Sequence, residues 1–345
     1  SVMRRLQRGI SLVEVMIALG IGAFMLIGII SLVASVSQTR GKLSVVSAQA
    51  ENGRYAMMML EEELSLAGFW GRYHPGVGVP NYQAISPCVS SNAAVDQGFY
   101  GFALNFPLPV SGIASGGTQP SCISAAGAPS TAEVITVRRV GVGTVEIADI
   151  PLGNTTPYLQ ISNCELDLLP YRLSHDPSQL TLRAKGCGSV EVARPLIVRS
   201  FFIANCDDCA NGGDGKPTLK MIEYANDSLG TFSMVSGVED MHIQYGLDLD
   251  GDGGPDCYAA DPAAATVPAG CAAALWSATA VDNWEDVVAV SVSLLLRSEE
   301  PALNQPVADT FNLGRGAEQG PFDDRFKRQV VSSTILMPNM AGPRE

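Results

Sequence analysis

The sequence predicts an α+β protein in which one long N-terminal helix packs on an antiparallel β-sheet head with long, disulfide-stapled loops. Three observations lead to this fold class. An uncharged apolar stretch runs from Val15 to Thr39 and is followed by a helical stripe of apolar residues. Segments rich in β-branched residues then recur to the end of the chain. Eight cysteines, all of them beyond residue 87, indicate an oxidising compartment.

The N-terminal segment has the features of a membrane anchor. Residues 1–9 carry three arginines and no acid, and the apolar stretch after them exceeds the about 20 residues that span a bilayer as a helix. We expect the transmembrane part at about residues 10–36. Because the basic residues precede it, the positive-inside rule places the N-terminus in the cytoplasm and the remainder of the chain outside.

Glu14 interrupts the apolar run near its start, and a carboxylate at membrane depth costs about 2.5 to 3.5 kcal/mol unless it finds a partner. A cut between Gly9 and Ile10 would create an amine about 6 Å from Glu14 along the helix axis. Between two staggered copies of such a helix, the carboxylate of one can neutralise the amine of the other. The alternative is an ordinary signal peptide, for which Val33-Ala34-Ser35 offers a weak cleavage site.

The run Gly9-Ile10-Ser11-Leu12-Val13-Glu14 resembles the class III signal of type IV prepilins and type II secretion pseudopilins. The resemblance implies that prepilin peptidase cleaves after Gly9, that the new N-terminus at Ile10 is methylated, and that Glu14 acts in assembly. Residues 1–9 would then be the leader. Ile10 stands where this class usually has Phe.

An amphipathic continuation carries the helix beyond the membrane, to about residue 68. Its apolar stripe recurs at spacings of three, four and seven, at Leu43, Val46, Ala50, Met57, Leu60, Leu64 and Ala67. Gly68 and Gly71, which bracket Phe69 and Trp70, form a glycine-rich stop. The chain therefore divides into a leader at 1–9, a helix at 10–68 and an exported globular head at 69–345.

Two segments of the helix and its end resemble PilW-type minor pilins of type IV pili. They are Glu51-Asn52-Gly53-Arg54-Tyr55-Ala56 and Gly68-Phe69-Trp70-Gly71, and stretches starting at Tyr245 and Trp284 are similar to that family as well. The resemblance implies a subunit that primes pilus assembly and sits in the tip complex, supporting adhesion and twitching motility. It also implies an inner-membrane location with a periplasmic head before assembly, and a place at the pilus tip on the cell surface afterwards.

The same resemblance implies these partners: other minor pilins, the major pilin, the inner-membrane assembly platform, prepilin peptidase and a tip adhesin.

Two alternative functions stay open. One is a minor pseudopilin of type II secretion, and the other is a single-pass membrane protein with a calcium-binding adhesive head. A subunit at the very apex would have no amine above it for Glu14, so we expect this protein below at least one other minor pilin.

Beyond Gly71 the pattern is that of strands joined by long loops. The candidate strands are residues 133–140, 144–150, 195–204, 218–224, 241–247, 286–297 and 329–337.

The loop at residues 248–256 holds four aspartates in nine residues, Asp248, Asp250, Asp252 and Asp256, with glycines between them. Such carboxylates can converge on a hard cation, which makes Ca²⁺ the cofactor that the sequence suggests. The second half of an EF-hand loop is missing, because Ala259 stands where a Glu is required. The alternative is an acidic, solvated hairpin turn.

For the cysteines, the simplest connectivity joins neighbours in the sequence. The expected pairs are Cys88 with Cys122, Cys164 with Cys187, Cys206 with Cys209, and Cys257 with Cys271. Cys206 and Cys209 have redox-site spacing, but the two aspartates between them should disfavour a thiolate, so we expect a structural disulfide there.

Composition and motifs argue against catalysis and against nucleic-acid binding. The 345 residues include 22 basic and 35 acidic ones, a formal net charge of −13, which repels phosphates. No H-E-x-x-H, G-x-S-x-G or Walker A motif occurs, so we expect no enzyme. We expect His242 to face solvent or to be hydrogen-bonded without a catalytic role, and Arg138-Arg139 to lie on a solvated face or to contact a partner.

Overall fold

The structure is a computed structural model, which describes residues 11–73, 81–83, 86, 88, 105–225 and 228–341. Gly9 and Ile10 lie outside these residues. The chain forms two compact units, residues 1–50 and residues 51–345, and each is described by itself.

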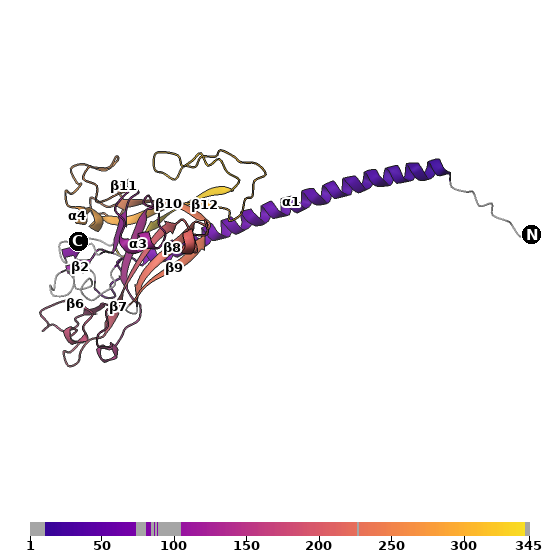
Figure 1. The fold of residues 1–345 in the computed structure, drawn as a ribbon. Coiled ribbons are helices and arrows are strands. Elements are labelled where there is room, and N and C mark those ends of the chain that lie inside the picture. Colours follow the sequence, from indigo (N-terminus) through magenta and orange to yellow (C-terminus); the bar gives the residue numbers. More distant parts are fainter. Residues whose placement is uncertain are drawn as a thin grey trace, which may run out of the picture. The chain divides into compact units, whose positions relative to one another are not determined.

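The helix α1 runs from Leu12 to Ser65 and passes through both units (Figure 1). Its segment Leu12–Ser37 is long and apolar enough to cross a membrane, and Glu14 in the first turn is the one charged residue of that segment. The expected apolar N-terminal helix is therefore present. Its last turns, from Glu51 onward, are part of the same compact unit as the head.

Two glycines end the helix, as the sequence predicted. Gly68 and Gly71 both have φ of +72°, in the left-handed region that glycine adopts without steric cost. The backbone carbonyls at the end of the helix, which have no partner within it, accept hydrogen bonds from a residue near the C-terminus. The side-chain amide of Asn339 donates to the carbonyl oxygens of Ser65, at 3.3 Å, and Ala67, at 3.1 Å.

The head consists of two main antiparallel sheets, with short helices in the loops (Figure 1). A seven-stranded sheet has the order β3-β4-β7-β5-β6, with β8 paired to β7 and β9 paired to β8. Its strands are β3 (Val110–Ile113), β4 (Val134–Val140), β5 (Tyr158–Ile161), β6 (Tyr171–Ser174), β7 (Ala193–Ala204), β8 (Thr218–Ala225) and β9 (Ser228–Ser236).

A four-stranded sheet has the order β11-β10-β12-β13. Its strands are β10 (Val238–Leu247), β11 (Cys257–Ala259), β12 (Val287–Arg297) and β13 (Arg328–Leu336). The strands β1 (Asn81–Gln83) and β2 (Asn105–Pro107) form a small parallel pair. The short helices are α3 (Ser121–Ala125), α4 (Ala280–Glu285) and the 3₁₀ turns η1 (Ile147–Asp149), η2 (Pro177–Gln179) and η3 (Ala210–Gly212).

Six of the seven predicted strands are present, as β4, β7, β8, β10, β12 and β13. The prediction at 144–150 is wrong, because this segment makes a single bridge, from Val145 to Ala193, and then turns into η1. The strand β7 begins at Ala193, so only one residue of the segment finds a backbone partner there. The strands β3, β5, β6 and β9 were not predicted. The first three are only four residues long, and the Ser and Gly residues of β9 weaken its strand signal.

The inner face of α1 is buried in a core that it shares with both sheets. Ala56, Leu60, Leu64 and Ala67 have no exposed surface. They belong to one apolar cluster with Phe201 of the seven-stranded sheet, and with Tyr245 and Leu294 of the four-stranded sheet. The C-terminal part of the predicted stripe is thus the face that holds the helix on the head.

Four disulfides staple the loops. They join Cys88 to Cys122, Cys164 to Cys187, Cys206 to Cys209, and Cys257 to Cys271, which are the neighbouring pairs that the sequence suggested. The head is therefore the disulfide-stapled, antiparallel structure that the sequence predicted.

Candidate functional site

Glu14 lies in the first turn of α1 on an exposed face of the apolar segment. The backbone amides of Glu14 and Val15 both donate to the carbonyl of Ser11, so the helix is regular around the carboxylate. Val15, Ala18, Leu19 and Gly22 flank Glu14 on this face. The carboxylate thus stands in an apolar surface that a neighbouring helix can cover.

The aspartate loop connects β10 to β11, and its base is closed by backbone bonds. The amide of Asp248 donates to the carbonyl of Asp286, and the amide of Asp256 donates to that of Leu247, both at 2.8 Å. Asp248 is 1% exposed, whereas Asp250 and Asp256 are exposed. Carboxylate oxygens of these three residues lie within 4.8 Å of one another. Asp252, the fourth predicted ligand, is not in this group.

Backbone amides donate hydrogen bonds to these carboxylates and so offset part of the repulsion between their negative charges. The two carboxylate oxygens of Asp248 accept from the amides of Gly251, at 2.8 Å, and Gly253, at 2.9 Å. Asp256 accepts from the amides of Leu249 and Asp250, at 2.7 and 3.2 Å. Asp252 instead accepts from Gly254. The three clustered carboxylates have the oxygen chemistry that Ca²⁺ prefers, and the loop is held in shape by its own backbone.

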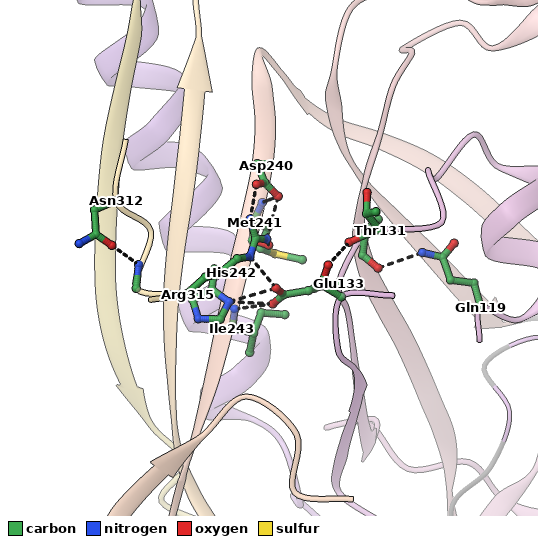
Figure 2. A network of polar contacts seen from close by, with 12 residues as sticks. Gln119, Thr131, Glu133, Asp240, Met241, His242, Ile243, Asn312 and Arg315 are labelled. Carbon is green, nitrogen blue, oxygen red and sulfur yellow. Dashed lines mark hydrogen bonds and ion pairs between the residues drawn. The ribbon is translucent and has the colours of Figure 1, made fainter. Parts of the chain in front are cut away.

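A second polar centre surrounds Glu133, which directly precedes β4 (Figure 2). Its carboxylate accepts from the amide of Ile243 at 2.7 Å and from Arg315 Nε at 2.9 Å, and it lies 3.0 Å from His242 Nδ1. Arg315 also forms a two-pronged ion pair with Asp240 and donates to the carbonyl of Met241. This network ties β10 and the segment between β12 and β13 to the other sheet.

His242 is therefore the hydrogen-bonded histidine that the sequence analysis allowed, and it does not face solvent, since it is 4% exposed. Its other ring nitrogen, Nε2, is buried and has no partner among the described residues. The strand pattern around His242 predicted its strand correctly. It contained no sign of Glu133 and Arg315, which lie 109 residues before and 73 residues after it.

A third network fixes α1 to the seven-stranded sheet. Glu63, on the buried side of the helix, accepts from Arg139 of β4, at 3.2 and 3.3 Å, and from Arg199 of β7. Arg199 also pairs with Glu223 of β8 at 2.9 Å. In the sequence, Glu63 stands among the charged residues between the apolar positions of the helical stripe, so the stripe gives no sign that Glu63 is buried. Arg139 and Arg199 lie on predicted strands, and a buried arginine needs a counter-charge. These two arginines are the signal in the sequence that could have indicated a buried acid such as Glu63.

The expectation for Arg138-Arg139 is wrong. Arg138 has no exposed surface, and its guanidinium donates to the carbonyl of Leu108 and the hydroxyl of Ser111. Burial lowers the pKa of Arg138 to about 10, because a low-dielectric surrounding disfavours the charged form. These arginines belong to the inside of the head, where β4 is covered on both faces.

The fold and the site define the class of the protein by its architecture: an apolar N-terminal helix that carries one acid, followed by a disulfide-stapled β head. Residues 200–339 match the family model of type IV pilus-assembly protein W, and residues 4–30 match that of the prokaryotic N-terminal methylation motif. The resemblance to PilW-type proteins and to prepilins is thereby confirmed. The matched PilW region starts within β7 and contains β8 to β13, the Asp248 loop and Arg315.

Among solved structures, the chain is similar to a type IV-like pilin from Thermus thermophilus. The identity is 13%, the TM-score is 0.33, and the alignment covers 85% of this chain and 97% of that one. No curated protein matches the chain significantly.

Proposed function

We propose that the protein is a minor pilin that primes assembly of a type IV pilus and takes its place in the tip complex, where it supports adhesion and twitching motility. The observation that carries the proposal is the prepilin-type motif at residues 4–30 on the same chain as the PilW region at 200–339. The apolar segment Leu12–Ser37 supports a membrane-held precursor whose head is periplasmic before assembly.

Glu14 gives this role a mechanism. In the initiating complex, its carboxylate would pair with the N-terminal amine of a neighbouring subunit, so that neither charge stays unpaired in the membrane. The partners would be other minor pilins above and below, then the major pilin, the assembly platform and a tip adhesin. Because Glu14 needs an amine above it, we infer that the protein lies beneath at least one other minor pilin.

The decisive experiment for the prepilin role is intact-mass and N-terminal peptide analysis of the protein from cells with and without prepilin peptidase. We expect a mature chain that starts at Ile10 and carries an N-methyl group, because the motif directs cleavage after Gly9. In cells without the peptidase, the leader that ends at Gly9 should remain attached. A chain that starts after Ser35, or that stays uncut in normal cells, contradicts the proposal.

A deletion strain separates the pilus role from the secretion role. We expect loss of surface pili and of twitching, both restored by the complementing gene. If pili are unchanged while secretion of exoproteins fails, the protein is a type II pseudopilin instead.

A second property is favoured by the clustered carboxylates of Asp248, Asp250 and Asp256: we propose that this loop binds Ca²⁺ weakly, with a dissociation constant of about 10⁻⁴ to 10⁻³ M. Calorimetric titration of the full chain in detergent should show calcium-dependent heat that Asp250→Asn removes. Asp252→Asn is the matched control, since Asp252 lies outside the cluster and should leave the heat unchanged. If the unaltered protein gives no heat, the proposal is wrong.

A further inference from the structure

Lys220 is a buried cation next to a disulfide. It lies on β8 and is 5% exposed. Its ammonium donates to Cys209 Sγ at 3.1 Å and to the carbonyl of Ala126 at 3.4 Å. Among the described residues, no carboxylate forms an ion pair with it. Burying an ammonium group without a counter-charge is costly, so this site favours any change that places a negative charge beside Lys220.

The Cys206–Cys209 disulfide can supply that charge. When it is reduced, Cys209 can remain as a thiolate, and the thiolate would lie beside the ammonium of Lys220. The flanking aspartates have less influence than the sequence suggested, because Asp207 and Asp208 are exposed and screened by water. Asp208 moreover accepts from the amide of Ala210, and the third nearby acid, Asp214, accepts from the amides of Asp207, Asp208 and Lys216. Lys220 is therefore the charge that acts most directly on Cys209.

The surroundings of the two sulfurs increase the effect of this charge. A Cβ atom at Gly127 would lie 2.5 Å from Cys209 Sγ and 2.7 Å from Cys206 Sγ, so only glycine allows the backbone to approach both sulfurs. Cys206 is buried and Cys209 is partly exposed. Cys209 is thus the cysteine of the pair that lies nearer the solvent, and Cys206 is the one that is shielded from water.

The other three disulfides differ from Cys206–Cys209 in two ways: in the part of the chain that the structure describes, they accept no hydrogen bond from a cation, and they close longer loops. Among the described contacts, no Lys or Arg side chain donates to their sulfurs; Cys88 Sγ accepts from the backbone amide of Cys122. Their cysteines are 34, 23 and 14 residues apart, against 3 for Cys206 and Cys209. A disulfide that closes a longer loop stabilises the fold more, because it removes more entropy from the unfolded chain.

We propose that Cys206 and Cys209 form a thiol–disulfide exchange site, in which Lys220 is the positioning residue that stabilises the Cys209 thiolate. The co-reactant is a dithiol, either of an oxidoreductase or of a small molecule. One of its thiolates attacks Cys209 Sγ, the S–S bond breaks, and Cys206 leaves and takes up a proton. The second thiolate of the dithiol then attacks its own sulfur in the mixed disulfide, and Cys209 leaves as a thiolate beside Lys220. Two electrons pass to the protein, and the dithiol becomes a disulfide.

The test is graded reduction of the full chain in detergent with dithiothreitol at pH 8, followed by alkylation and peptide mass analysis of each cysteine. In the unaltered protein, we expect Cys206 and Cys209 to be reduced at the lowest dithiothreitol concentration of the four pairs. In Lys220→Met, the concentration needed for half-reduction of this pair should rise roughly tenfold, because the thiolate loses its counter-charge. Lys220→Arg should restore the original value.

Two controls separate charge from fold. Lys216→Met removes an exposed lysine of the same loop that donates to neither sulfur, and it should leave the half-reduction point unchanged. The other three disulfides report the integrity of the head and should be reduced alike in every variant. The proposal is overturned if another pair is reduced first in the unaltered protein. It is also overturned if Lys220→Met and Lys216→Met give the same half-reduction point for Cys206 and Cys209.

Discussion

At the scale of single residues, Asn52 and Gly53 explain why part of the Glu51–Ala56 signature is needed. The side-chain amide of Asn52 donates to the carbonyl of Ser236 at 3.3 Å and so links the helix to the end of β9. Gly53 is buried, and a Cβ atom there would lie 2.2 Å from Leu296 Cδ1 of β12. The missing side chain at Gly53 therefore sets how closely α1 approaches the four-stranded sheet.

Replacing Gly53 with Ala tests this close approach. Ala normally favours a helix over Gly by about 1 kcal/mol, but here the methyl group must displace the side chain of Leu296, and overpacking of a core costs about 1 to 3 kcal/mol. We therefore expect a net loss of up to about 2 kcal/mol of unfolding free energy. Chemical denaturation of the full chain in detergent measures it. Gly41→Ala is the matched control, because nothing lies within 4 Å of its Cβ position, and it should leave stability unchanged or raised. Equal effects of the two substitutions would contradict the explanation.

At the scale of elements, one carboxylate in the loop between β5 and β6 accepts several hydrogen bonds that hold this loop. Asp167 accepts from the backbone amide and from Nε of Arg183, both at 2.7 Å, and from the hydroxyl of Ser162 at 2.7 Å. These bonds, with that from the Arg183 amide the strongest, lower the pKa of Asp167 to about 2. Together with the Cys164–Cys187 disulfide, the carboxylate fixes a loop that exposes Leu166 and Leu168 to solvent.

The lowered pKa makes the loop sensitive to acid. The pKa of Asp167 is lower in the folded protein than in the unfolded chain, so the ionised carboxylate stabilises the fold. This stabilisation is present above about pH 4 and is lost as the pH falls towards 2. Asp167→Asn should therefore melt at a lower temperature than the parent at pH 7. The difference should shrink as the pH falls below about 4 and should be small at pH 2. Thermal melts from pH 7 to pH 2 measure it, and a difference at pH 2 as large as that at pH 7 would show that something other than ionisation is lost.

Some of the helices and strands could be predicted from the sequence, and others could not. The helix and the long strands were predictable, because periodicity and β-branched runs are local signals. The four disulfides agree with the simplest connectivity, which joins neighbouring cysteines in the sequence. The segment 144–150 has the composition of a strand but only one backbone partner, at Ala193, which is a property of the sheet and not of the segment.

At the scale of the whole molecule, the sequence indicates some of the candidate functional residues but not the contacts between distant parts of the chain. Glu14 can be singled out as a candidate from the sequence, because it is the one charged residue in an apolar run, and its role stays a prediction. The Glu133 network, the Glu63 contacts and the proximity of Lys220 to Cys209 join residues far apart in the chain, so no local pattern contains them. Of the four predicted metal ligands, three come together, because Asp252 turns to the amide of Gly254.

Glu14→Ala tests the proposed assembly role of the molecule. We expect the variant to insert into the membrane normally, since the substitution removes a charge whose insertion costs about 2.5 to 3.5 kcal/mol. Its recovery with other minor pilins in crosslinked membranes should nevertheless fall at least tenfold, because the amine of its neighbour loses its partner. Glu61→Ala, an exposed acid outside the apolar segment of the same helix, is the control. Normal recovery of Glu14→Ala in pili would show that the charge pairing is not needed.

The cap that Asn339 places on α1 has a consequence for the order of folding. The chain is made from its N-terminus, so the helix emerges first, but the amide that satisfies Ser65 is 274 residues further on. The strand β13 also enters its sheet only at the end of synthesis. The membrane segment can therefore be inserted long before the head is complete. Loss of the last residues would leave the end of the helix without its cap, so a truncated chain should be inserted in the membrane but carry an unfinished head.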